Sequence, residues 1–338
     1  KMKILFIGDY KANTGPSNVN KNLKKYLPSE VLFINSSNTL IKCMELIIKV
    51  LFSKVIVISG FSRINILSIK VAKLLNKTII YILHGCIAYE NKINDLNKDN
   101  IETIEEECFD AAHCILAVSK NYMYWFKEHY PKYKEKTSYL NNGVEWKILD
   151  KVRNISSVKR EPNTIITMGG GRPQKNNITI CKAIEILNRK RKQKLKLIVL
   201  GRDYRDTEKI KSYDFVDYVG QVDHEQIYFY LKKSQLFIQN SFVESFGLAT
   251  IEALISGCDI LVSKNVGATC IMKSIESSDI INDYTNPNEI ADKIEYLLCN
   301  TNNARLLDGI DRYRTSCEYV ADRLIKIINE LTTKANLL

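Results

Sequence analysis

Short runs rich in β-branched residues alternate along the whole chain with longer segments whose apolar residues recur at helical spacing, such as 18–27 and 64–75. This alternation is typical of parallel α/β architecture. It predicts two doubly wound, Rossmann-like sheets. The expected strands are 4–7, 31–34, 55–58, 78–83, 113–118 and 137–140 in the first half, and 164–168, 195–200, 215–219, 235–239 and 258–262 in the second.

A polar segment at 151–163 interrupts the alternation, contains Pro162 and lacks periodicity, so we expect the domain linker there. The predicted domains are therefore 1–150 and 151–318. The remaining segment, 319–338, carries apolar residues at helical spacing up to Leu331 and needs a surface to cover.

Composition narrows the possible classes of protein. The richest apolar segment, 40–52, is broken by Lys42, Glu45 and Lys49, and no run approaches the roughly 20 apolar residues of a membrane-spanning helix. The nine cysteines are an odd number without a Cys-x-x-Cys pair, which favours a reduced, cytoplasmic setting. The net charge of +11 is compatible with nucleic acid, anionic lipid or phosphorylated substrates, and does not choose among them.

Candidate chemistry begins at the carboxyl ends of the predicted strands, where ligands of open α/β sheets bind. After the first strand, the polar loop 8–17 enters a helix and can present amides to a phosphate, although Gly15 is equally compatible with a simple turn. His84 ends the fourth strand, where either a site role or a structural hydrogen bond is possible. The other histidines show no metal-ligand spacing with it, so zinc is not expected.

In the second half, three consecutive glycines at 169–171 precede Arg172 and Lys175. The glycines let a ligand approach the backbone, and the two cations suit a diphosphate, with a bidentate fork from arginine and a point charge from lysine. A solvated loop with incidental cations is the alternative.

The segment 239–257 contains two carboxylates around the start of a helix, which runs from about Gly247 to Gly257. Glu252 lies on or beside the apolar face of this helix, where a carboxylate is costly unless it accepts hydrogen bonds. Glu244 lies in the preceding loop and can reach the same site. Alternatively, Glu244 is a solvated charge and Glu252 a salt-bridged helix residue.

Together these residues resemble the group 1 glycosyltransferases, the retaining family with the GT-B fold that includes glycogen-synthase-like, capsule and lipopolysaccharide enzymes. The most specific element is the pair Glu244 and Glu252, separated by seven residues. The supporting motifs are Gly171-Arg172-Pro173-Gln174-Lys175, Leu200-Gly201, Gly220-Gln221-Val222 and Asn142-Gly143-Val144. The resemblance implies two Rossmann-like domains facing each other across a cleft, with the final helix crossing back to the N-terminal domain.

Position by position, the resemblance implies that Glu252 holds the ribose and Glu244 the transferred sugar. Arg172 and Lys175 would bind the diphosphate and stabilise it as leaving group. The further residues expected at the donor and the sugar are the amides of Phe246, Gly247 and Leu248, the loop glycine Gly15, and His84. The family's usual Gly-Gly reads Thr14-Gly15 here, which weakens the expectation for that loop.

The resemblance thus predicts a retaining, metal-independent hexosyltransferase. It would move a sugar from a nucleotide diphosphate to a saccharide or lipid-linked saccharide, in cell-surface polysaccharide or glycoconjugate synthesis. No cofactor is expected, because Arg172 and Lys175 would neutralise the leaving group. The alternatives are a sugar-nucleotide epimerase of the same fold, a nucleic-acid-binding protein and a catalytically silent donor-binding partner; we do not expect nucleic acid as a partner.

Basic and aromatic residues mix at 120–136, a pattern that suggests contact with an anionic membrane at its cytoplasmic face. An ordinary helix that packs its aromatic residues on the sheet explains the same segment equally well.

Overall fold

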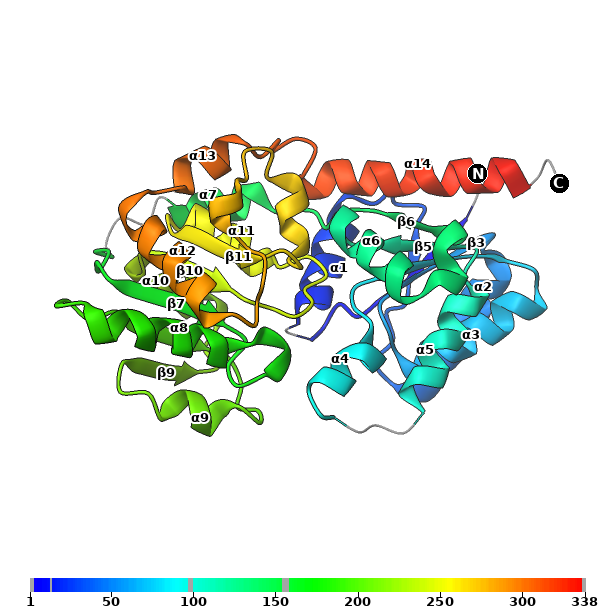
Figure 1. Ribbon diagram of the computed structural model, residues 1–338. Helices are drawn as coiled ribbons and strands as arrows, with labels where there is room; N and C mark the ends of the chain where they lie inside the picture. Colours follow the sequence, from blue (N-terminus) through cyan, green and yellow to red (C-terminus); the bar gives the residue numbers. More distant parts are fainter. Residues whose placement is uncertain (1–2, 13, 97–99, 154–157, 336–338) are drawn as a thin grey trace. The chain divides into compact units, whose positions relative to one another are not determined.

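The computed structural model describes residues 3–12, 14–96, 100–153 and 158–335 (Figure 1). The chain divides into two units, which are described separately. Unit 1 comprises Lys1–Lys92, Asn97–Glu145 and Arg312–Leu338, and unit 2 comprises Ile93–Leu96 and Trp146–Asp311. The breaks at 145/146 and 311/312 lie several residues before the expected boundaries at 150/151 and 318/319.

Unit 1 is built on a parallel sheet of six strands in the order β2-β1-β3-β4-β5-β6. The four central strands, β1, β3, β4 and β5, are buried, as parallel strands covered on both faces must be, whereas the short edge strands β2 and β6 are partly exposed. They are β1 (Ile4–Ile7), β2 (Leu32–Phe33), β3 (Val55–Ser59), β4 (Thr78–Leu83), β5 (Cys114–Ala117) and β6 (Thr137–Tyr139).

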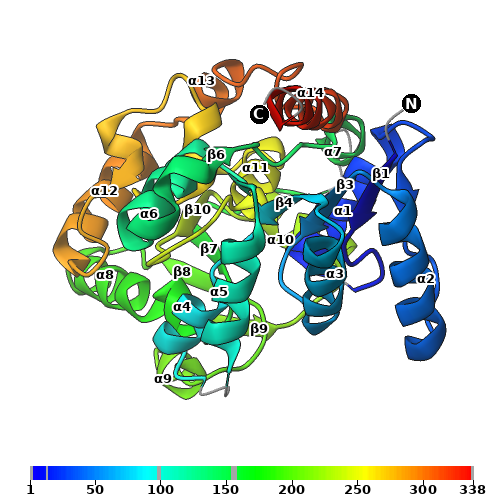
Figure 2. The same cartoon turned by 90° about the vertical axis from the view of Figure 1, so that its right-hand side faces the viewer.

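The helices of unit 1 pack in two groups, one with α2, α3 and α5 and one with α1 and α14 (Figures 1 and 2). Their bounds are α1 (Gly15–Tyr26), α2 (Thr39–Phe52), α3 (Arg63–Leu74), α4 (Ile87–Ile93), α5 (Ile101–Ala111), α6 (Lys120–His129), the 3-10 helix η1 (Pro131–Lys136) and α14 (Cys317–Ala335).

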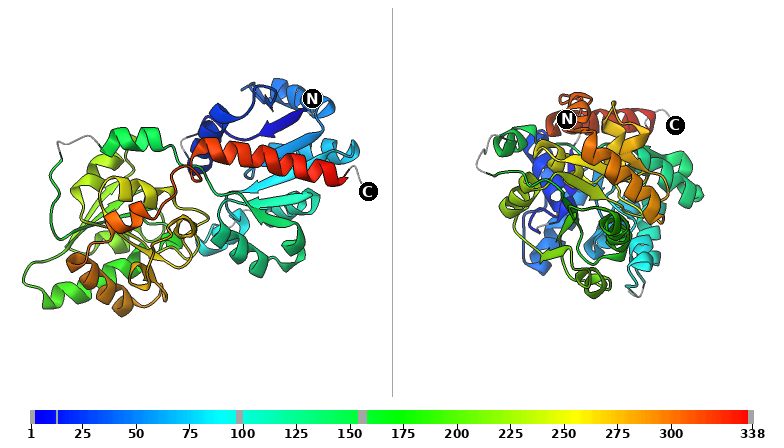
Figure 3. Two further views of the ribbon diagram at one scale, coloured as in Figure 1. Left: turned by 90° about the horizontal axis from the view of Figure 1, so that it is seen from above. Right: turned by 60° about the vertical axis from the view of Figure 1, so that its left-hand side comes forward.

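The final helix, α14, belongs to unit 1 and packs against α1 (Figure 3). Val144 and Ser316 form a parallel bridge where the chain returns to this unit. A Cβ atom on Gly143 would lie 2.6 Å from the Cα atom of Cys317, so this contact requires glycine. The apolar residues expected to need a surface, such as Leu324 and Ile328, are buried.

Unit 2 contains a second parallel sheet of six strands in the order β12-β11-β10-β7-β8-β9. The strands are β7 (Thr164–Met168), β8 (Lys196–Leu200), β9 (Val216–Gly220), β10 (Leu236–Gln239), β11 (Asp259–Ser263) and β12 (Ile280–Ile281). β12, with only two residues, was not predicted, because so short a run carries no periodicity.

The helices of unit 2 also form two groups, α8, α9 and α12 in one and α7, α10, α11 and α13 in the other. They are α7 (Trp146–Arg153), η2 (Pro173–Lys175), α8 (Asn177–Lys190), α9 (Thr207–Lys211), α10 (His224–Lys233), α11 (Leu248–Ile255), η3 (Gly267–Ile271), η4 (Ser277–Asp279), α12 (Pro287–Cys299) and α13 (Asn303–Asp308). The prediction that the linker starts at residue 151 is wrong, because α7 continues to Arg153 and packs on α11. Residues 154–157 of the expected linker lie outside the described residues.

Candidate active site

The topology of unit 2 brings two of the predicted loops together. β7 and β10 are neighbours at the centre of the sheet, and the chain continues from β7 to β8 on one side and from β10 to β11 on the other. Ligands of open parallel sheets bind beyond the carboxyl ends of the strands at such a switch point. The loop 169–175 follows β7 and the loop 240–247 follows β10, so both begin at this point.

The loop after β7 depends on two glycines with left-handed backbone angles. Gly169 has φ +108°, and a Cβ atom there would lie 2.3 Å from the Cγ atom of Lys175. Gly170 has φ +57°, and its Cβ atom would lie 2.1 Å from the carbonyl oxygen of Arg202. The missing side chain of Gly169 therefore allows the aliphatic part of Lys175 to lie directly on the backbone of this loop. That of Gly170 allows the backbone of Gly201 and Arg202 to approach closely.

Lys175 forms an ion pair with Glu244, and each side chain is only 15% exposed. Oε2 of Glu244 also accepts a hydrogen bond from Nε2 of Gln239 at 2.7 Å. Oε1 of Gln239 in turn accepts from the Thr250 hydroxyl at 2.7 Å. Gln239 ends β10 and Thr250 lies in α11, so this chain of bonds fixes the carboxylate between a strand and a helix. Neither bond to Glu244 uses its Oε1, which leaves acceptor capacity for a ligand hydroxyl.

The start of α11 lies beside this carboxylate. Gly247 is the N-cap residue with φ +91° and makes no side-chain cap bond, and a Cβ atom on it would lie 3.1 Å from Cγ of Glu244. The helix therefore presents the positive end of its dipole next to the pair formed by Lys175 and Glu244. The Phe246 side chain is buried and its carbonyl accepts from the Ala268 amide, which anchors the turn that leads to Leu248.

Arg172 has a different neighbour. Its guanidinium carbon lies 5.0 Å from the ring centre of Tyr204, and Nη2 donates to the Tyr204 hydroxyl at 3.2 Å. Tyr204 was not predicted as a site residue, and nothing in its sequence surroundings indicates this contact.

Glu252 is also paired, with its Oε1 atom 3.3 Å from Nε2 of His224. Hydrogen bonding to Glu252 raises the pKa of His224 above its usual value. This geometry corresponds to the alternative of a salt-bridged helix residue. Of the two acidic and two basic residues expected to share one site, the structure brings Lys175 and Glu244 into contact, whereas Arg172 and Glu252 have separate partners. His224 was not predicted as the partner of Glu252.

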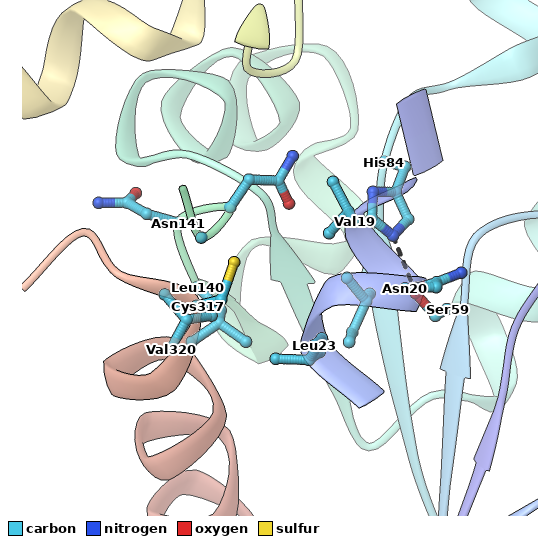
Figure 4. A pocket seen from close by; sticks show the side chains of 12 residues that line it. Val19, Asn20, Leu23, Ser59, His84, Leu140, Asn141, Cys317 and Val320 are labelled. Atoms are coloured by element: carbon cyan, nitrogen blue, oxygen red, sulfur yellow. Dashed lines mark hydrogen bonds between the residues drawn. The ribbon is translucent and has the colours of Figure 1, made fainter. Parts of the chain in front are cut away.

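In unit 1, His84 lies at the end of β4 and bonds to Ser59 at the end of β3 (Figure 4). Nε2 of His84 is 2.9 Å from the Ser59 hydroxyl, which donates its own proton to Oδ1 of Asn20 at 2.6 Å. The Asn20 amide is oriented by its Nδ2 group, which donates to the carbonyl of Asp9 at 3.2 Å. Because the serine proton is already used, Ser59 accepts from His84, and the imidazole carries its hydrogen on Nε2.

Burial lowers the pKa of His84 to about 4, so the ring is neutral at pH 7 and its Nδ1 is an acceptor. His84 lines a pocket of about 620 Å³ together with Asp9, Thr14, Ser17 and Glu90. The predicted loop after β1 therefore reaches the same pocket as His84. Gly15 itself does not line this pocket, and a Cβ atom placed on it would meet nothing within 4 Å.

The segment 120–136 buries three of its six tyrosine, tryptophan and phenylalanine side chains inside unit 1. Tyr122, Phe126 and Tyr133 are buried, and Phe126 contacts Phe109 with ring centres 5.2 Å apart. Tyr124, in contrast, is 57% exposed. The packing favours an ordinary helix over a membrane-binding patch at this segment.

The part of the chain that the structure describes contains neither a metal-binding cluster nor a membrane-spanning helix. No group of three or more histidine, cysteine, aspartate or glutamate side chains in this part of the chain is arranged to hold a metal ion. None of its helices combines the length and the apolar character needed to pass through a membrane.

Solved structures of low sequence identity share the fold over almost the whole chain. Alr3699/HepE from Anabaena, in complex with UDP-glucose, has a TM-score of 0.69 at 15% identity, covering 98% of this chain and 100% of its own. Sucrose-phosphate synthase from Thermosynechococcus elongatus gives 0.68 at 17%, covering 99% and 100%. A glycosyltransferase from Rickettsia africae gives 0.67 at 16%, covering 98% and 99%. At these identities the likeness confirms the fold, GT-B.

No curated protein matches the sequence. The family described as "Glycosyl transferases group 1" matches residues 150–308, which include both predicted glutamates, the glycine-rich loop and the two cations. Residues 150–308 therefore form a domain of the glycosyl transferase group 1 family.

Proposed function

We propose that the chain is a retaining hexosyltransferase that transfers a sugar from a nucleoside diphosphate sugar to a saccharide or lipid-linked saccharide acceptor, for cell-surface polysaccharide or glycoconjugate synthesis. The observation that carries this proposal is the ion pair of Lys175 and Glu244 at the switch point of unit 2, next to the N-terminus of α11. A sugar diphosphate needs both kinds of group in one place, a cation for the phosphates and a carboxylate for the hydroxyls.

In this proposal Lys175 stabilises the negative charge that develops on the leaving diphosphate. Its ammonium has three N–H donors, and the bond to Glu244 uses one of them. Glu244 accepts a hydroxyl of the transferred sugar through Oε1 and stabilises positive charge on the ring. Arg172 adds a second cation after leaving Tyr204, and Glu252 binds the ribose. These cations supply the charge neutralisation that a metal ion supplies in other transferases.

The acceptor is assigned to the pocket of unit 1. Its carboxylates at Asp9 and Glu90, the neutral imidazole of His84 and several hydroxyl groups suit the many hydroxyls of a saccharide. UDP-glucose, which Alr3699/HepE binds, is the first donor to test.

The test is turnover of the purified chain with a panel of uridine, guanosine, thymidine and adenosine sugar nucleotides and saccharide acceptors. We expect release of free nucleoside diphosphate that requires an acceptor, continues in EDTA, and yields a product with the donor's anomeric configuration by NMR. Conversion of the sugar nucleotide without an acceptor would instead identify an epimerase, and inversion or loss of activity in EDTA would contradict the retaining or metal-independent mechanism.

A further inference from the structure

Helix α2 exposes an apolar face that none of the proposed catalytic roles uses. Its exposed apolar residues recur at positions three, four and seven apart, which places them on one side of the helix. Six of them are half exposed or more: Leu40, Ile41, Met44, Ile48, Leu51 and Phe52. So many large apolar side chains on one exposed face mark an interaction surface rather than ordinary surface variation.

The opposite side of α2 already holds the helix on unit 1. Leu46 and Val50 are fully buried there, and α2 packs alongside α3 at the edge of the unit (Figure 2). The outward residues are therefore not needed to attach the helix. With 14 residues, α2 is too short to span a membrane but long enough to lie in the plane of its surface.

The sequence that contains α2 and its neighbouring elements is strongly basic. Residues 38–78 contain six lysines and one arginine but a single acidic residue, Glu45. Glu45 is already held by Lys49 and by the backbone amides of Asn35 and Ser36.

Lysines gather at the C-terminal end of α2 in particular. The Lys3 ammonium lies 5.7 Å from the ring centre of Phe52, Lys77 donates to the carbonyl of Leu51 at 3.1 Å, and Lys54 is exposed directly after the helix. Long lysine side chains beside an apolar helix face can keep their charges at the headgroup level while the apolar residues enter the acyl region.

We propose that α2 docks unit 1 on a membrane that contains anionic lipid, with the outward apolar residues in the lipid and the surrounding lysines on the headgroups. The apolar face matches the acyl region of such a membrane, and the lysines beside it match the anionic headgroups. A second copy of the chain matches this surface less well, because a symmetric contact through α2 would bring the lysines of both copies together. An acidic protein would match the charge, but the convex side of a single helix offers no pocket for its anchoring side chains.

The proposal is independent of the transfer reaction, since docking is measured without donor or acceptor. The measurement is co-sedimentation of the full chain with phosphatidylcholine vesicles, with and without phosphatidylglycerol. We expect binding to the anionic vesicles that weakens as salt rises. The triple variant Ile41→Gln/Met44→Gln/Ile48→Gln should bind at least tenfold more weakly, because three apolar side chains no longer enter the lipid.

A charge variant keeps the test independent of any change in the folding of α2. Lys3→Gln/Lys54→Gln should lower vesicle affinity by roughly tenfold or more. Lys190→Gln/Lys192→Gln removes the same charge from exposed lysines at the end of α8 in unit 2, within the basic run 189–196, and should leave affinity within about twofold. Tyr124→Gln should also leave it unchanged, which separates α2 from the segment 120–136.

The proposal is overturned if the wild type does not bind anionic vesicles at low salt, or if the lysine variants of unit 2 weaken binding as much as those at α2. It is also overturned if sedimentation shows a dimer that the triple variant dissociates while vesicle binding is unaffected. Thermal unfolding of each variant within a few degrees of the wild type shows that the comparison concerns folded protein.

Discussion

Lys175 and Glu244 are paired in a largely buried environment, so the two charges depend on each other. Replacing Glu244 by glutamine preserves its shape but leaves the lysine without its counter-ion and removes the charge that would stabilise the sugar. We expect Glu244→Gln to lower kcat/KM for transfer by about 10²–10³-fold, the usual scale for one preorganised electrostatic contact. Steady-state release of nucleoside diphosphate measures it.

The matched control is Glu208→Gln, which removes the same charge from a side chain of unit 2 that is 88% exposed. It should leave kcat/KM within about twofold, because exposed ion pairs contribute little. Equal effects of the two substitutions would argue against a role for Glu244 in the reaction.

The pair of His224 and Glu252 allows a test by titration. Hydrogen bonding to Glu252 raises the pKa of His224, so the stability this pair contributes is fully present below the unfolded pKa of about 6.5 and is lost as pH rises through the folded pKa. In Glu252→Gln, the pKa of His224 should fall, which NMR titration of the imidazole measures directly. A pKa that does not move would mean that the contact is absent in solution.

For single residues, the sequence indicated which residues belong to the candidate site better than it indicated which side chains they contact. The seven-residue spacing of Glu244 and Glu252 identified both carboxylates, and the glycines identified the loop of Lys175. The partners Tyr204 and His224 lie about 30 residues away in the sequence, Tyr204 in the loop between β8 and α9 and His224 at the start of α10, and a local pattern carries no signal for such contacts.

The close packing of the glycine-rich loop after β7 leads to a prediction about the stability of the protein. In Gly170→Ala, the new Cβ atom would meet the carbonyl oxygen of Arg202 at 2.1 Å in a left-handed backbone conformation. The free energy of unfolding should fall by about 2 kcal/mol or more, because backbone on both sides must shift. Urea unfolding of the two proteins measures this difference.

Gly15→Ala is the control, since a Cβ atom at the start of α1 would meet nothing within 4 Å. Its stability should change by less than about 0.5 kcal/mol. A loss of stability equal to that of Gly170→Ala would contradict the assignment of close backbone contact to the loop after β7.

Glu105 of α5 links two helices of unit 1, because its buried carboxyl accepts from the amides of Ile87 and Ala88 at the start of α4, at 2.7 and 3.1 Å. Burial raises the pKa of Glu105 from 4.5 to about 7, although the two amide bonds oppose the rise. The folded state therefore retains this proton more firmly than the unfolded state does, and stability is lost as pH rises between about 4.5 and 7.

As the pH is raised from 5 to 8, the thermal unfolding midpoint of the wild type should accordingly decrease relative to that of Glu105→Gln. The glutamine variant lacks the titrating group, so the comparison cancels the other ionisations. A difference in midpoint that is constant over this range would contradict the raised pKa.

The elements themselves were largely predictable, since long apolar strands and amphipathic helices such as β4 and α14 carry strong periodicity. The ends of helices and strands, and the shortest elements, were not predictable. α7 extends into the expected linker because the helix begins at Trp146, before the linker, and its buried residues Trp146 and Leu149 hold it on the unit while its last turn continues into the polar segment.

For the whole molecule, alternation of strands and helices indicated two doubly wound sheets, and both are present with parallel strands throughout. The net charge of +11 did not identify a partner by itself. Its distribution is more informative, because the stretch around α2 contains seven basic residues and one acidic residue next to an exposed apolar face. To recognise this combination one must know which side of α2 is buried, and the sequence does not give it, because apolar residues occupy both the buried side and the exposed side of the helix.

We propose that unit 2 binds a nucleoside diphosphate sugar through Lys175 and Glu244. Isothermal titration of UDP-glucose into the wild type, Lys175→Gln and the control Lys211→Gln tests it most directly, since Lys211 is a surface lysine of the same unit. We expect binding by the wild type and the control, and at least tenfold weaker binding by Lys175→Gln, because a charged contact to the diphosphate is lost. Equal affinity of all three proteins, or the absence of binding for every sugar nucleotide of the donor panel, would contradict the claim.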